Sequence, residues 1–392
     1  MMTKPRARDL GIPFEGRTGN HNAITDVAGV TVGYATVIEG DSTRTGVTII
    51  HPRGQDNHDP VFAAWFPFNG NGEMTGSAWL EEGGFLEGPI GITNTHSVGV
   101  VRDTIIKWQV EQDSIFQGWS CPLVTETADG WLNDINGFFV KPEHVLEALN
   151  AARSGPISEG NVGGGTGMLC YEFKGGTGTS SRKLPEKLGG WTIGAFVQTN
   201  FGRRYQLTIA GVPVGAHLKE NTVWTNGENP FKQDDGSLIV IIATDAPLLS
   251  HQLKRLAKRA SIGMARTGSL GGNGSGDIFL AFSTANPGAA RGDERGLASL
   301  QALSNNYIDP LLIASAYATE EAIINSMIAA EDMTGHKGVN VKALPHQELQ
   351  EIMKQYNRKQ ERRGRRETTS GMQEAVSGLQ LRSDRNAKGS KQ

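Results

Sequence analysis

Hydrophobic positions along the chain gather into short runs rich in β-branched residues, separated by turn residues. Two runs between residues 27 and 50, GVTVGYATVI and GVTII, are joined by charged and glycine-bearing residues. Later runs of the same kind are VFAAWFPF (61–68), PLVTE, TIGAFVQTN (192–200), QLTIAGVPV (206–214), LIVIIATDAPL and IFLAFST. Runs of this length and composition are typical of buried strands.

Helical spacing is clearest in four segments. Val101, Ile105 and Trp108 repeat at helical intervals, and Pro142 precedes EHVLEALNAARSG as a first helical residue would. A stripe of Leu and Ala begins near residue 249, and a long apolar segment follows residue 310. Strands and helices mix without strict βαβ alternation, which favours an α+β layered architecture over a doubly wound sheet.

Two stretches show no periodicity. Residues 219–235 are polar and predict no element, and from about residue 355 the chain is polar and Arg-rich (NRKQERRGRRETTS). We therefore predict one folded domain over residues 1–354 and a mostly disordered tail over residues 355–392.

Composition narrows the class of protein. Hydrophobic residues make up 38% of the chain, as in ordinary globular proteins. The net charge is -3, which gives no electrostatic reason to expect binding to nucleic acid or to a membrane. No segment is apolar enough for a signal peptide or a membrane span, so we expect a cytoplasmic protein. The two cysteines and nine histidines show no ligand spacing, so no metal or other cofactor is expected.

Several familiar catalytic motifs are absent. The sequence has no G-x-S-x-G elbow, no H-E-x-x-H and no phosphate-binding loop with its lysine. The segments GGGTGM and GNGSGD are glycine-rich but lack the remainder of a nucleotide-binding fingerprint. Tight turns that bring backbone close to a reacting group explain these glycines equally well.

The junction between Gly236 and Ser237 is unusual, because a long polar stretch ends there and the most hydrophobic strand begins at once. One interpretation is a loop that ends on a turn. The other is self-cleavage, in which the Ser237 hydroxyl attacks the Gly236 carbonyl and water hydrolyses the resulting ester. Cleavage would free an α-amine with a pKa near 7.7–8.0, which could serve as general base for its own hydroxyl.

Several long motifs resemble those of the L-aminopeptidase/D-esterase family, the DmpA-like enzymes that include the β-peptidyl aminopeptidases. They are RARDLGIPFEGRTGNHNAITDVAGVTVG, NGNGEMTG, NTHSVGVVRD, DGWLNDI, VGGGTGM, VQTNFGRR, KGVNV and the segment from DGSLIVIIATDAPL through GSLGGNGSGDIFLAF. The resemblance covers about residues 5–355. It implies self-cleavage after Gly236, which would give chains 1–236 and 237–392 with Ser237 as the N-terminal nucleophile.

The resemblance also assigns further site residues. The family's G-S-G-[DE] motif places a second serine at Ser275 and its acidic partner at Asp277, where relatives often carry Glu. Two residues apart at a strand entry, both side chains can lie on one side of the sheet. The family's oxyanion asparagine maps to Asn200, and an aromatic substrate contact maps to Trp131, where relatives carry Tyr.

The fold implied by the resemblance is a four-layer αββα sandwich similar to the N-terminal-nucleophile hydrolases. The implied enzyme removes N-terminal residues from short peptides, amides or esters without a cofactor, as a tetramer of cleaved heterodimers. Two alternatives stay open at this point. One is a self-cleaving amidase of ω-amino acid oligomers, and the other is a non-catalytic glycine-rich binding protein that never cleaves.

Overall fold

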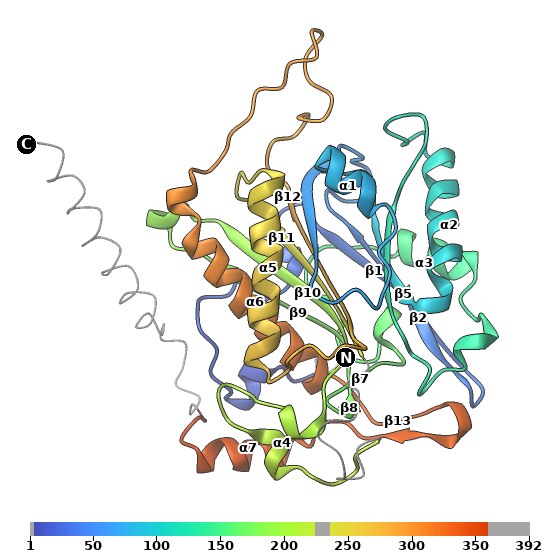
Figure 1. Ribbon diagram of the computed structural model, residues 1–392, viewed down its shortest axis with the longest axis vertical. Helices are drawn as coiled ribbons and strands as arrows, with labels where there is room; N and C mark the ends of the chain where they lie inside the picture. Colours follow the sequence, from blue (N-terminus) through green and yellow to red (C-terminus); the bar gives the residue numbers. More distant parts are fainter. Residues whose placement is uncertain (1–3, 224–235, 360–392) are drawn as a thin grey trace, which may run out of the picture.

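Two β-sheets stacked face to face form the centre of the molecule (Figure 1). The computed structural model describes residues 4–223 and 236–359, so most of the predicted C-terminal tail lies outside the described residues. Helices cover the outer side of each sheet.

The larger sheet has six strands in the order β4-β3-β12-β11-β10-β9. Its strands are β3 (Val61–Pro67), β4 (Phe85–Leu86), β9 (Gly176–Lys183), β10 (Thr192–Asn200), β11 (Ser237–Thr244) and β12 (Gly276–Ser283). All eight residues of β11 are buried, because the strand lies at the centre of a sheet that is covered on both faces. This explains the unbroken apolar run that follows Ser237.

The smaller sheet has four strands in the order β1-β2-β5-β6. They are β1 (Thr31–Glu39), β2 (Thr43–His51), β5 (Ile90–Asn94) and β6 (Leu123–Thr127). Two short hairpins lie apart from both sheets, one formed by β7 (Leu169–Cys170) and β8 (Phe173–Lys174), the other by β13 (Met333–Thr334) and β14 (Asn340–Val341).

The longer helices lie on the outer faces. Helices α5 (Ser250–Arg266) and α6 (Asp309–Ile328) pack on the six-stranded sheet, whereas α2 (Val98–Glu111) and α3 (Pro142–Asn150) pack on the four-stranded sheet (Figure 1). The remaining helices are α1 (Ser77–Gly83), α4 (Val214–His217) and α7 (His346–Gln355). Helix α6 is buried on nearly every side because it packs on both the sheet and α5.

Three apolar clusters separate the layers. One lies between α5, α6 and the six-stranded sheet, a second lies between the two sheets, and a third lies between the four-stranded sheet and helices α2 and α3. The order helix, sheet, sheet, helix is the predicted four-layer α+β sandwich.

Two departures of the local structure from the sequence pattern have a clear physical reason. The apolar run 206–214 forms no strand, because Ala210 and Gly211 both have positive φ and turn the chain back on itself at an Ile209–Val212 bridge. Strand β9 was not predicted, because its sequence GTGTSSRK is polar. Its buried polar groups are satisfied by other elements, as when the Ser180 hydroxyl donates to Ala318 O on α6.

None of the helices in the described part of the chain is long and apolar enough to cross a membrane.

Candidate active site

Three neighbouring strands of the six-stranded sheet bring Asn200, Ser237 and Gly276 together, where β10 ends and β11 and β12 begin. In the antiparallel pair of β10 and β11, Asn200 lies opposite Ser237, and in the parallel pair of β11 and β12, Ser237 lies opposite Gly276. The end of β10 and the starts of β11 and β12 therefore meet in one row. Ser237 is only 4% exposed and is the first residue of its strand.

The backbone around the Gly236–Ser237 peptide is tightly packed. The N–H of Gly276 donates a hydrogen bond of 2.9 Å to the carbonyl oxygen of Gly236. A methyl group added at Gly236 would lie 2.8 Å from Asn200 O, and one added at Gly276 would lie 2.3 Å from Asn71 O. Both distances are too short for any side chain, so close approach explains both glycines.

A buried polar network surrounds the start of β12. The Ser275 hydroxyl donates to Asp277 Oδ1 at 2.9 Å, and the Asn69 amide donates to Asp277 Oδ2 at 2.9 Å. Asp277 and Ser275 are 1% and 3% exposed. The sequence motif had identified Ser275 and Asp277 but not Asn69, which lies in the glycine- and asparagine-rich turn after β3.

The side chains of Ser275 and Asp277 lie on one face of the sheet and the Ser237 hydroxyl lies on the other, because successive side chains of a strand point to opposite faces. Ser237 shares a face with Ile239 and Ile241, which pack between the two sheets, whereas Asp277 shares the opposite face with Phe279. Ser275 lies next to Gly276, the pairing partner of Ser237, and contacts Asp277. The Ser275 and Asp277 side chains therefore lie on the face of the sheet opposite to the Ser237 side chain.

The side-chain amide of Asn200 is held at both ends. Its Oδ1 accepts a hydrogen bond of 3.0 Å from Leu169 N, and its Nδ2 donates one of 2.9 Å to Ala128 O. These partners fix which end of the amide is oxygen and which is nitrogen. The second Nδ2 hydrogen has no acceptor among the described residues, and Asn200 lies opposite Ser237 in the pair of β10 and β11.

Glu126 is a candidate site residue that the sequence analysis missed. Its carboxylate accepts from Glu73 N at 3.0 Å and from the Thr95 hydroxyl. A methyl group added at Gly72 would touch both Glu126 Oε1, at 3.0 Å, and Gly276 Cα, at 3.3 Å, so the carboxylate lies close to the start of β12. Burial raises its pKa. The sequence signal that could have identified Glu126 is the presence of an acidic residue in the apolar strand run PLVTE.

Trp131 lies in the turn after β6, three residues beyond Ala128, the residue that contacts the Asn200 amide. Its side chain is 46% exposed. The contact of Trp131 with substrate stays a prediction.

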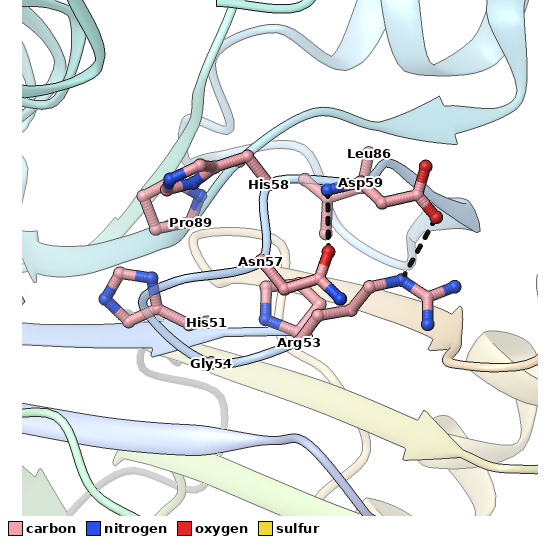
Figure 2. Close-up of a pocket in the computed structure, with 10 residues that line it drawn as sticks. His51, Arg53, Gly54, Asn57, His58, Asp59, Leu86 and Pro89 are labelled. Carbon is pink, nitrogen blue, oxygen red and sulfur yellow. Dashed lines mark hydrogen bonds and ion pairs between the residues drawn. The ribbon is translucent and has the colours of Figure 1, made fainter. Parts of the chain in front are cut away.

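A small pocket lies at the other end of the sheet and is separate from this site. His51, Arg53, Asn57, His58 and Asp59 line it, together with Leu86 and Pro89 (Figure 2). Its volume is about 10 Å³, which is room for a single water molecule. Arg53 donates to the carbonyl of Thr284, which directly follows the far end of β12, so the pocket lies the length of that strand away from Ser237.

No group of three or more His, Cys, Asp or Glu side chains in the described ranges is arranged to hold a metal ion. The candidate site consists of hydroxyl, carboxylate and amide side chains with the backbone N–H of Gly276, a set suited to nucleophilic acyl transfer.

Comparison with known proteins identifies close relatives. The sequence profile of Peptidase family S58 matches residues 22–341. The chain is 51% identical over 373 residues to the β-peptidyl aminopeptidase BapA of Sphingosinicella microcystinivorans, covering 90% of this chain and 93% of that protein.

Solved structures agree in fold. One is the L-aminopeptidase D-Ala-esterase/amidase of Ochrobactrum anthropi, described as a prototype for the serine aminopeptidases and a new variant of the Ntn hydrolase fold. It matches with a TM-score of 0.84 and 48% identity, over 91% of this chain and 100% of that chain. A β-aminopeptidase from Burkholderia sp. matches with a TM-score of 0.81 and 46% identity over 90% of this chain and 99% of that chain.

Proposed function

The chain belongs to Peptidase family S58, and on this premise we propose that it cleaves itself between Gly236 and Ser237 and then uses Ser237 as its nucleophile. Family membership and these relatives make it a serine-type aminopeptidase of the N-terminal-nucleophile class. We propose short peptides, amino-acid amides and esters as its substrates. The observation that best supports the assignment of Ser237 is the row of Asn200, Ser237 and Gly276 across three adjacent strands.

In the proposed maturation step, Ser237 Oγ attacks the carbonyl carbon of Gly236. Negative charge develops on Gly236 O, which accepts the Gly276 N–H at 2.9 Å. The C–N bond then breaks, the nitrogen takes a proton, and the two residues are joined by an ester. Water hydrolyses the ester to give a carboxylate at Gly236 and a free α-amine on Ser237.

In the proposed catalytic cycle the new amine removes the proton of the Ser237 hydroxyl as the oxygen attacks the substrate carbonyl. The free Nδ2 hydrogen of Asn200 stabilises the resulting oxyanion. The leaving amine takes the proton, and water then hydrolyses the acyl ester. Asp277 and Ser275 hold the α-amine in place.

The first prediction tests maturation. On a denaturing gel the 42.1 kDa chain should be replaced by two fragments, residues 1–236 and 237–392, and the smaller should begin Ser-Leu-Ile-Val. N-terminal sequencing and intact mass identify the cut. A fully active preparation that contains only uncut chain would contradict the proposal.

We further propose that Glu126 binds the ammonium group that every aminopeptidase substrate carries. The carboxylate is buried beside Gly276, and an incoming cation would compensate the loss of water around it.

The second prediction follows from this role. Glu126→Gln should raise KM about 10- to 100-fold, because a charge-assisted hydrogen bond is lost, with a smaller change in kcat. Because burial raises the pKa of Glu126, the wild-type KM should also rise as pH falls toward that pKa. Steady-state kinetics on an amino-acid amide measure both effects. Glu82→Gln changes an exposed carboxylate on α1 and should leave KM unchanged, so equal effects of the two substitutions would refute the assignment.

A tetramer of cleaved heterodimers and a cytoplasmic location remain further proposals. The first rests on the family resemblance, and the second on the finding that no helix in the described part of the chain could cross a membrane. Size-exclusion chromatography with light scattering tests the assembly.

A further inference from the structure

Lys174 is a buried lysine that the proposed mechanism does not use. It ends strand β8, is 0% exposed, and burial lowers the pKa of its ammonium to about 7. Its Nζ donates to two backbone carbonyls, Met168 O and Gly175 O, each at 2.9 Å, and lies 3.4 Å from a third, Gly165 O. A lysine held inside the protein by carbonyl oxygens calls for a physical explanation.

The contact with Met168 O leads directly to the candidate oxyanion donor. The carbonyl of Met168 and the N–H of Leu169 belong to one peptide group. Its oxygen accepts from Lys174 Nζ, and its N–H donates to Asn200 Oδ1 at 3.0 Å. One peptide group therefore joins the Lys174 amine to the side chain of Asn200, the residue that lies opposite Ser237 in the pair of β10 and β11.

Hydrogen bonds in such a chain polarise one another. A cation on the Met168 oxygen makes the Leu169 N–H a stronger donor, because it withdraws electron density from the peptide nitrogen. A stronger bond to Asn200 Oδ1 has the same effect on the Asn200 amide, so its Nδ2 hydrogen becomes a better donor to an oxyanion. The chain also fixes the direction of that donor.

Lys174 is one of several groups that anchor the hairpin on which it lies, together with Arg204, which donates to the carbonyls of Tyr171 and Glu172. Its strands β7 and β8 have two residues each, too few for a stable hairpin alone. Its turn residues, Tyr171 and Glu172, have φ values of 51° and 62°. This left-handed backbone conformation is one that residues other than glycine rarely adopt. Lys174 closes the open end of this hairpin, next to Leu169.

We propose that Lys174 is a positioning residue for catalysis, which orients and polarises the Asn200 amide through the peptide group between Met168 and Leu169. The proposal rests on the proposed function of Asn200 as oxyanion donor. It predicts an effect on kcat, with little effect on KM, because an oxyanion forms only after substrate has bound.

The decisive experiment is a double-mutant cycle of Lys174→Met, Asn200→Ala and the double variant, with kcat expressed per cleaved chain. Lys174→Met should lower kcat about three- to tenfold with KM within about twofold, and Asn200→Ala should lower kcat about 100- to 1000-fold. The double variant should match Asn200→Ala alone, because Lys174 acts through that amide. Lys183→Met, the same change on β9 at a partly buried lysine bonded to Thr192, should leave kcat unchanged.

Wild-type kcat in Lys174→Met, or losses that multiply in the double variant, would overturn the proposal. Wild-type kcat in Asn200→Ala would instead refute the proposed function of Asn200. Where Lys174→Met does not fold, Lys174→Gln takes its place, because it keeps an N–H donor without the charge.

A second measurement needs neither activity nor cleavage. In the uncut Ser237→Ala chain labelled with nitrogen-15 leucine, the Leu169 amide proton should resonate upfield when Lys174→Met is added, because its hydrogen bond weakens. An unchanged Leu169 resonance would show that the ammonium does not polarise this peptide, and the proposal would be wrong.

Discussion

Ser237→Ala should abolish self-cleavage and turnover together. The substitution removes the hydroxyl that attacks Gly236, so the new α-amine never forms, and it also removes the oxygen that would carry the acyl group. Hydrolysis of an amino-acid amide should fall by about four orders of magnitude or more. A denaturing gel should show only the 42.1 kDa chain, and a kinetic assay on the same sample gives the residual rate.

Two further variants make this result specific. Ser237→Cys should still cleave, because a thiol can make the corresponding N→S shift. Ser261→Ala, which removes a hydroxyl from the surface of α5, should cleave and turn over as the wild type does. Wild-type turnover by Ser237→Ala would place the nucleophile elsewhere.

Asp277→Asn should lower the rate about 100-fold or more while the protein still folds and assembles. The substitution keeps the shape of the side chain but removes the charge, and Ser275 and Asn69 both donate to the carboxylate oxygens. Without the negative charge the α-amine of Ser237 loses support for its protonated form, so its pKa should fall and the pH profile of kcat should shift downward. Rates measured over a range of pH on cleaved protein check both effects.

Asp277→Glu provides the matched comparison, because it keeps the charge on a longer side chain of the kind that relatives often carry. It should retain most of the activity and the wild-type pH profile. If Asp277→Asn equalled the wild type in rate and pH profile, the carboxylate would be a structural partner of Ser275 and Asn69 only.

The sequence predicted most of the elements whose apolar pattern is continuous. Strand β10 has the predicted bounds, β11 begins at the predicted position but ends four residues before the predicted run does, and α5 follows the predicted stripe of Leu and Ala. These segments pack an apolar face against a neighbouring layer, so the spacing of their apolar residues indicates which face is buried. Strand β9 escaped prediction because its buried side chains are polar. Arg182, for example, pairs with Glu321 on α6, a partner that sequence periodicity cannot reveal.

Some residues of the candidate site could be recognised from the sequence around them, and others could not. The junction at Gly236 and Ser237, and the motif with Ser275 and Asp277, are local features that the sequence displays within a few residues. Asn200 was assigned only through the family resemblance, since an asparagine at the end of a strand is otherwise an ordinary turn residue.

By itself, the sequence determined the layered α+β class, the strand that begins at Ser237 and, through its motifs, the resemblance to a self-cleaving aminopeptidase family. Only the tertiary structure decided which distant groups surround that serine. The register of β10 and β12 against β11 places Asn200 and Gly276 beside Ser237, and the turn at residue 72 brings Glu126 next to Gly276. Lys174 and Glu126 are ordinary charged residues in the sequence, because burial and hydrogen-bond partners arise only when separate strands and loops pack together.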